Sequence, residues 1–139
     1  MKSLSDILCE AQITGIEEVA KLMKSYVKQW YKYHPDGDGW DDDLEPVKNI
    51  KDGIVRMGSN YNEGEWNVLE FELKCGVTGR IHHQLSDGMF SKTSFINGFI
   101  IYLDNDDSPF GGYRFRYTTS PTFKEAIDYI KKLNKNSKR

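Results

Sequence analysis

The chain has 139 residues, of which 38% are hydrophobic and 29% are charged, and its formal net charge at pH 7 is −2. This balance excludes a broadly basic nucleic-acid-binding protein, because such binding needs many Lys and Arg contacts to phosphates. No apolar run approaches the roughly 18 residues of a membrane span, and the N-terminus lacks the apolar core of a secretory signal. We therefore expect a soluble, cytoplasmic protein that folds as one domain over residues 1–139.

Two helices are predicted near the N-terminus. Ser3 to Asp6 has the form of a capping box, in which the two side chains satisfy free N–H groups, and it predicts a short first helix. A second helix is predicted over about residues 15–33, ending before Pro35, because apolar residues recur there at intervals of three and four. The apolar residues are Ile16, Val19, Ala20, Met23, Val27 and Trp30.

The most acidic stretch of the chain follows. It contains no Lys or Arg, and its members are Asp36, Asp38, Trp40, Asp41, Asp42, Asp43 and Glu45. A calcium-binding EF-hand loop starting at Asp36 would need Gly at position six and Glu at position twelve, but Asp41 and Val47 stand there. Two interpretations stay open: a solvated loop, or a surface that attracts a basic partner and uses Trp40 as an anchor.

From about residue 52 the hydrophobic period changes to two, which is typical of β-strands. Strands are predicted at residues 54–57, 66–75, 80–85 and 113–117. Asn97-Gly98, between the apolar runs 93–96 and 99–103, predicts a β-hairpin. Residues 104–112 are predicted to form a polar turn.

A last helix is predicted from Ser120-Pro121 onward, because proline is favoured in a first turn and Thr122 with Glu125 repeats the capping box. Its apolar face comprises Phe123, Ala126, Ile127, Ile130 and Leu133. The tail, residues 134–139, is expected to be disordered. The predicted fold class is α+β: an antiparallel sheet of about five or six strands with N-terminal helices and one C-terminal helix packed on one face.

An enzymatic alternative rests on Asp52, Glu72 and Lys74. Glu72-Leu73-Lys74 resembles the carboxylate–lysine half of the restriction-endonuclease-like nuclease motif, with Asp52 as a second carboxylate. Two carboxylates would hold Mg²⁺, and the lysine would position the attacking water. However, the glycine-containing residues 76–79 interrupt the chain where that family has a helix, and Glu72 also fits the polar face of an alternating strand.

Other potential metal or acid–base residues are sparse. His82 and His83 are adjacent, so on a strand they point to opposite faces and cannot chelate one ion together. We expect one of them to be exposed and the other half-buried and hydrogen-bonded. Cys9 and Cys75 are solitary, so neither a zinc site nor a disulfide is expected, and we predict no metal and no cofactor.

A ligand-binding alternative rests on Arg114 and Arg116, which alternate with aromatic residues in 113–117. Such a mixture suits nucleotides, since rings stack on bases and guanidinium groups bind phosphates. In one strand, however, the arginines and the aromatic rings lie on opposite faces, so a neighbouring strand would have to supply rings beside the arginines.

In general build, residues 66–133 resemble immunity proteins of bacterial polymorphic and contact-dependent growth-inhibition toxins. The resemblance lies in a hydrophobic strand hairpin, an Asp-rich turn and a closing helix that begins Ser120-Pro121-Thr122-Phe123. It implies a non-enzymatic inhibitor that binds one cognate toxin domain, commonly a nuclease, and covers its active site or substrate-binding surface. It assigns no binding residue.

The acidic stretches of the sequence agree with an inhibitor of a nuclease, because nuclease surfaces that bind phosphates are basic and attract carboxylates. The predicted partner-binding residues are the acidic stretch 36–45 and a second acidic loop with Asp104, Asp106 and Asp107. The alternatives are the metal-dependent nuclease and a nucleotide or small-ligand-binding protein, including a phage-encoded sponge for signalling nucleotides. We expect no membrane partner and no direct nucleic-acid binding.

Overall fold

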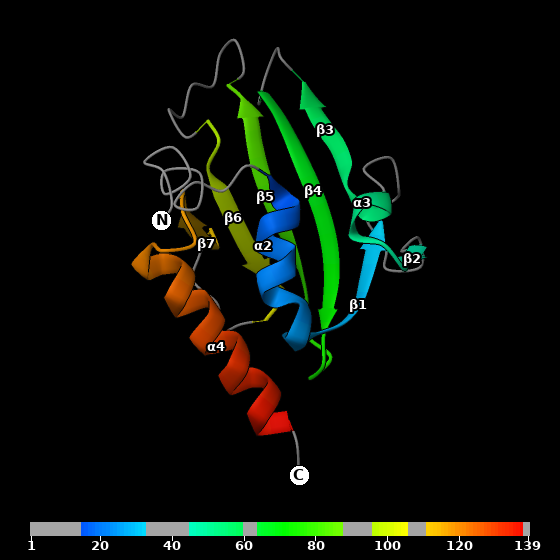
Figure 1. The fold of residues 1–139 in the computed structure, drawn as a ribbon, viewed down its shortest axis with the longest axis vertical. Helices are drawn as coiled ribbons and strands as arrows, with labels where there is room; N and C mark the ends of the chain where they lie inside the picture. The colour runs from blue at the N-terminus through cyan, green and yellow to red at the C-terminus, as the bar shows by residue number, and fades with distance from the viewer. Residues whose placement is uncertain (1–14, 33–44, 60–63, 88–95, 106–110, 138–139) are drawn as a thin grey trace, which may run out of the picture.

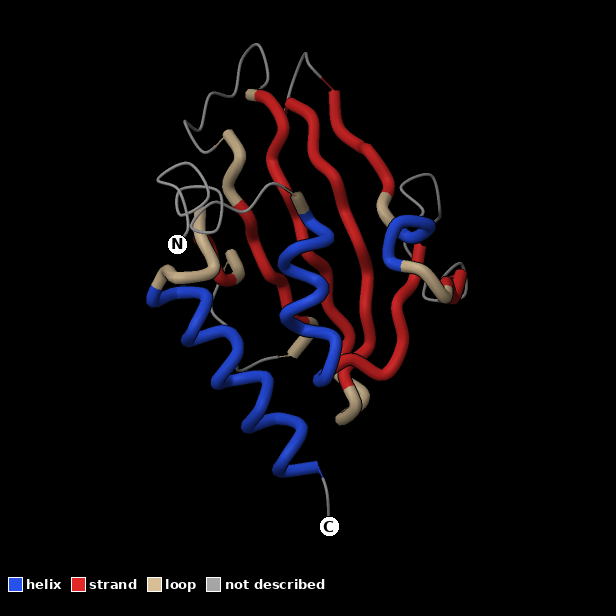
Figure 2. The backbone as a smooth tube through the Cα atoms, in the orientation of Figure 1, coloured by secondary structure: helices blue, strands red, loops and turns tan. Residues whose placement is uncertain are grey.

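The computed structural model describes residues 15–32, 45–59, 64–87, 96–105 and 111–137. These residues form a seven-stranded antiparallel sheet with helices on one face (Figures 1 and 2), which confirms the predicted α+β class. The strands are β1 (Val27–Lys32), β2 (Glu45–Val47), β3 (Val55–Ser59), β4 (Gly64–Leu73), β5 (Thr78–Ser86), β6 (Phe99–Leu103) and β7 (Tyr113–Phe115). The helices are α2 (Ile16–Met23), the 3₁₀ helix η1 (Lys24–Tyr26), α3 (Ile50–Gly53) and α4 (Pro121–Ser137).

The strand order is β2-β1-β4-β5-β6-β7, and every pairing is antiparallel. Strand β4 is the centre of this arrangement because it carries three partners. One of its edges pairs with β5, while the other pairs with β3 at residues 64–68 and with β1 at residues 70–73. Among the described helices, none is long and apolar enough to cross a membrane.

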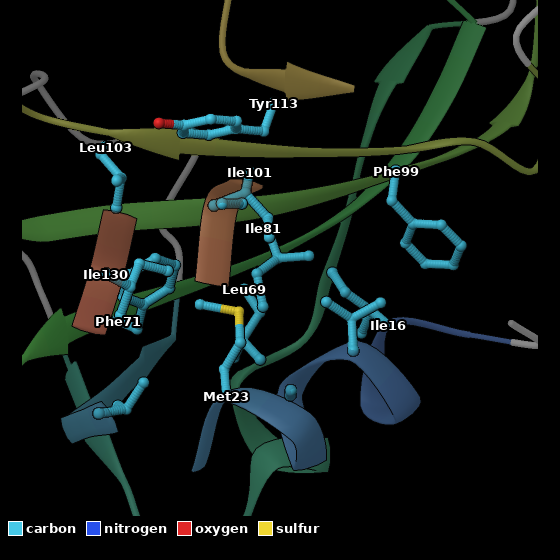
Figure 3. Close-up of a cluster of buried hydrophobic side chains, with 14 of the residues drawn as sticks. Ile16, Met23, Leu69, Phe71, Ile81, Phe99, Ile101, Leu103, Tyr113 and Ile130 are labelled. Atoms are coloured by element: carbon cyan, nitrogen blue, oxygen red, sulfur yellow. The ribbon is translucent and has the colours of Figure 1, made fainter. Parts of the chain in front are cut away.

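The hydrophobic core lies between the sheet and the helices α2 and α4. Leu69 and Phe71 of β4 point to this side, toward Met23 of α2 and Ile130 of α4 (Figure 3). Leu73, two residues further along β4, belongs to the same buried cluster. Each large aliphatic or aromatic side chain buried here contributes about 1.5–3 kcal/mol. The amphipathic periods of α2 and α4 therefore fix both helices to the same face of the sheet.

The helix predicted over residues 15–33 is wrong in its second half, because the chain leaves the helix after Met23 and becomes strand β1 at Val27. Val27 and Trp30 are both buried on the helix side although they are three residues apart. A register shift between Val27 and Gln29 explains this, since a bulge inserts one residue and changes the alternation. Because of the bulge, the buried residues of strand β1 are three positions apart, a spacing that is typical of a helix.

The hairpin predicted at Asn97-Gly98 pairs residues 93–96 with residues 99–103, and residues 93–95 lie outside the described residues. Strand β6 pairs with β5 on one edge and with β7 on the other. Asn97 does adopt the left-handed conformation that the turn signal predicts, with φ 68°. Its N–H donates to the carbonyl oxygen of Gln84 at 2.8 Å, so the turn leads into pairing with β5.

The remaining differences concern the ends of elements. Strand β7 ends at Phe115, two residues earlier than predicted. Helix α4 begins at Pro121, in agreement with the first-turn proline, and extends to Ser137, so it includes residues 134–137 that we expected to be disordered. The short first helix predicted after Ser3 lies outside the described residues.

Asn134 joins α4 to the end of the sheet, and we predict that its replacement destabilises the protein. Its Oδ1 accepts the N–H of Cys75 at 3.0 Å, its Nδ2 donates to the carbonyl of Tyr26 at 3.0 Å, and the residue is 7% exposed. Asn134→Ala leaves both backbone groups without this partner, so the free energy of unfolding in urea should fall by about 2–4 kcal/mol. Asn136→Ala, at an exposed position of the same helix, is the control, and equal effects of the two changes would contradict the role of Asn134.

Candidate binding face of the sheet

The sheet has a second face, which no described helix covers. Helices α2 and α4 pack on the Leu69 side, and so does α3, since a Cβ on Gly53 would lie 2.8 Å from Leu69 Cδ1. Successive side chains of a strand point to opposite faces of the sheet. The side chains that point away from Leu69 form what we call the helix-free face. Its members include Tyr31 of β1, Val55 and Met57 of β3, Trp66, Val68, Glu70 and Glu72 of β4, Thr78, Arg80, His82 and Gln84 of β5, Ile100 and Tyr102 of β6, and Arg114 of β7.

Three rings cross the middle of this face in a row. Trp66 and His82 meet edge to face with their centroids 5.8 Å apart, and His82 and Tyr102 do the same at 4.8 Å. The guanidinium of Arg80 lies over the Tyr102 ring, 5.9 Å from its centroid. Sequence reasoning missed this row because its rings come from three strands, and only the pairing register shows that they are neighbours.

Carboxylates and guanidinium groups occupy different strands of the helix-free face. Glu70 and Glu72 lie on β4, while Arg80 lies on β5 and Arg114 on β7. Glu72 Oε1 accepts a hydrogen bond from the Tyr31 hydroxyl at 3.2 Å, and burial together with this bond raises the pKa of Tyr31. Glu70 is the direct cross-strand partner of Arg80, so opposite charges are neighbours in the middle of this face.

The three residues of the nuclease alternative are not assembled. Asp52 is exposed on α3, which packs on the Leu69 side, whereas Glu72 points to the helix-free face. Lys74 is exposed in the turn after β4. Within the described ranges, no group of three or more His, Cys, Asp and Glu side chains could hold a metal ion.

Most of the predicted partner-binding residues lie outside the described residues: Asp36, Asp38, Trp40, Asp41, Asp42, Asp43, Asp106 and Asp107. The points from which the two acidic segments leave the sheet are described. Lys32 and Glu45 are cross-strand partners, so the first segment starts and ends at one pair. The second acidic segment starts at Asp104. The N–H of Asp104 donates to the carbonyl of Thr78 at 2.9 Å, and its Oδ2 accepts from the hydroxyl of Thr78 at 2.8 Å.

Arg114 and Arg116 lie near the far edge of the sheet. Arg114 is exposed and paired with Ile100, so it shares the helix-free face with the rings of His82 and Tyr102. Rings beside Arg114 therefore come from the neighbouring strands, because the aromatic side chains of β7 itself point to the other face of the sheet. Arg116 lies one residue past β7 and donates from Nη1 to the carbonyl of Ile96 at 3.0 Å.

His82 and His83 point to opposite faces, as alternation predicts, but their environments differ from the prediction. His83 stacks on Phe99 on the helix side, with centroids 4.4 Å apart, and is 5% exposed. Nε2 of His82 and both ring nitrogens of His83 are buried and have no hydrogen-bond partner in the described part of the chain. Burial, assisted by Arg80, lowers the pKa of His82 to about 4, and burial also lowers that of His83.

Comparisons with protein-family models, with curated proteins and with solved structures found no significant match to this chain.

The depressed pKa of His82 predicts a loss of stability in acid. The ordinary histidine pKa is 6.5 and the folded value is about 4, so between these values the unfolded chain binds more protons. Stability is complete above pH 6.5 and should fall by about 3 kcal/mol as the pH falls to 4. His82→Phe, which keeps an aromatic ring in the row, should reduce this fall in urea unfolding measured across pH. An identical pH dependence in both proteins would contradict the assignment to His82.

Proposed function

We propose that the chain is a non-enzymatic inhibitor of the immunity type, which binds a partner protein with a basic surface, such as a nuclease toxin domain, through its acidic segments. The observation that carries the proposal is the attachment of both acidic segments to the sheet. The first is closed at its base by the Lys32–Glu45 pair, and the second starts at Asp104, which holds two hydrogen bonds to Thr78. Loops on a rigid scaffold are the usual carriers of binding residues.

The base of the first segment is itself held to the core. Trp30 is 8% exposed and meets Phe71 edge to face at 6.0 Å, and its strand partner is Val47. The side-chain amide of Gln29 donates to the carbonyl of Val47 at 3.0 Å. The hairpin stem is therefore rigid close to the acidic segment, which lowers the entropy lost when a partner binds.

The charge at the second attachment point also favours a basic partner. The carboxylate of exposed Asp104 accepts from a neutral hydroxyl, and within the described ranges it forms no ion pair with a Lys or Arg side chain. Its negative charge is thus available for attraction at long range, which raises association rates.

The two alternatives have less support. The nuclease residues Asp52 and Glu72 lie on different sides of the sheet. A nucleotide at Arg114 would have stacking rings beside it, but the same face also carries the carboxylates of Glu70 and Glu72, three strands away.

The proposal predicts that the partner is a stoichiometric basic protein, which affinity capture from the host and mass spectrometry would identify. Replacing Asp41, Asp42 and Asp43 together by Asn should then lower the association rate about tenfold at low ionic strength, because steering depends on these charges. The difference should shrink at high ionic strength, where salt screens exposed charges.

A matched control removes three exposed carboxylates from the helices: Glu18→Gln, Glu125→Gln and Asp128→Asn. This variant has the same net charge as the Asp41–Asp43 variant and should associate with the partner nearly as fast as the wild type. Equal association rates for wild type and the Asp41–Asp43 variant would exclude this segment, and capture of nucleotides without any protein would contradict the proposal as a whole.

A further inference from the structure

We infer that strand β3 pairs with β3 of a second copy of this chain, edge to edge, so that the two sheets join into one. This inference does not rest on the proposed inhibition and is tested without the partner protein. Strand β3 (Val55–Ser59) pairs with β4 on one side, and no described strand pairs with its other side (Figure 1). An open edge is a template on which another chain can form backbone hydrogen bonds.

The hydrogen bonds of β4 show which backbone groups of β3 point to the open side. The N–H of Leu73 donates to Val77 at the turn into β5, and the N–H of the next residue, Lys74, donates to Tyr26 just before β1. Odd-numbered residues of β4 therefore form their hydrogen bonds toward β5, and even-numbered residues form theirs toward β1 and β3.

Arg56 and Gly58 are the residues of β3 that present unpaired backbone groups. Val55 and Met57 pair with even-numbered residues of β4, so their N–H and C=O groups point to β4. Arg56 and Gly58 alternate with them, so their N–H and C=O groups point to the open side. Within the described ranges, these four groups have no hydrogen-bond partner.

Two copies of this edge complement each other in one antiparallel register. A twofold axis through Met57 places the two Met57 residues opposite each other and places Arg56 opposite Gly58 of the second copy. Each pair of Arg56 with Gly58 then exchanges two hydrogen bonds, and the axis generates this pair twice. The register therefore uses all the outward N–H and C=O groups of both residues in both copies.

The charged side chain of β3 also favours this register. Arg56 lies opposite a glycine, so it meets no like charge directly, and it keeps its ion pair with Glu65 of its own copy. A register centred on Arg56 would place the two arginines opposite each other, which is destabilising. It would also place Gly58 opposite Ile54, whose N–H already donates to Lys51.

The apolar side chains of β3 would continue the ring row across the joint. Met57 is the cross-strand partner of Trp66 and points to the helix-free face. In the register centred on Met57, the two methionines are direct neighbours, and each has a tryptophan on its other side. Methionine sulfur makes favourable contacts with aromatic rings, so this strip would add to the hydrogen bonds.

Strand length sets the choice of edge and the expected strength. The border strands β2 and β7 have three residues each, and β2 contains Pro46, which has no N–H, whereas β3 has five residues. Five residues span about 17 Å. Such a joint buries less than the roughly 1,000 Å² of a stable specific interface. The dimer should therefore be weak and depend on concentration.

Sedimentation velocity of the full chain up to high concentration tests the joint. The mass of the wild type should rise from 16.1 kDa toward twice that value. Arg56→Pro removes an outward N–H and leaves the β3–β4 hydrogen bonds in place, since proline is tolerated on an edge strand. The variant should dimerise at least about tenfold more weakly, because two hydrogen bonds of the joint are lost.

The matched control is Arg56→Ala, which removes the same side chain and its ion pair but keeps the N–H. This variant should dimerise like the wild type. Circular dichroism and thermal unfolding of both variants establish that they are folded.

A cysteine variant tests the register without a proline. Opposite residues of a pair without hydrogen bonds have Cα atoms about 4.5 Å apart, which is within the range of a disulfide. In a chain with Cys9→Ser and Cys75→Ser, Met57→Cys should therefore form a disulfide-linked dimer on oxidation, seen by non-reducing electrophoresis. Val55→Cys is the control on the same face. Its two copies would lie about 14 Å apart along the strands and should not cross-link.

Three results would overturn the inference: a wild type that stays monomeric up to its solubility limit, a folded Arg56→Pro variant that dimerises as strongly as Arg56→Ala, or Val55→Cys cross-linking as readily as Met57→Cys. If the wild type stays monomeric and the Arg56 and Gly58 amides gain protection from hydrogen exchange only with the captured basic partner, the open edge belongs to a strand of that partner instead. The association test of the acidic segments is separate from all of these.

Discussion

The register between β4 and β5 is the constraint on which both faces of the sheet depend. Pairing runs from Glu65 with Ser86 to Glu72 with Thr78, and it is the longest in the sheet. It brings Leu69 beside Ile81 on the helix side and Val68 beside His82 on the other. A slip of one residue would exchange the two faces of a strand. The same hydrogen bonds therefore position the core and the ring row.

Gly79 shows how closely this register is fitted. A Cβ at this position would lie 2.7 Å from the Phe71 ring and 2.3 Å from the carbonyl oxygen of Tyr102. The missing side chain lets Phe71 lie across β5 and meet Trp30 of β1. Trp30 in turn supports the stem of the first acidic segment. A close contact in the centre of the sheet thus bears on the strand pair from which the first acidic segment leaves.

Sequence patterns predicted the elements that follow one regular period. The alternation in β4 and the first-turn proline of α4 gave the right element types, because local geometry and burial agree there. Prediction failed where tertiary pairing decides. The bulge in β1 gave Val27 and Trp30 a helical spacing, which predicted a helix where the chain forms a strand. The acidic segments are visible in sequence, but their attachment to the sheet is not.

The helix-free face carries aromatic side chains as well as polar ones. Val68 and Ile100 lie beside His82 of the ring row and are 0% and 1% exposed, so the middle of this face is shielded from solvent.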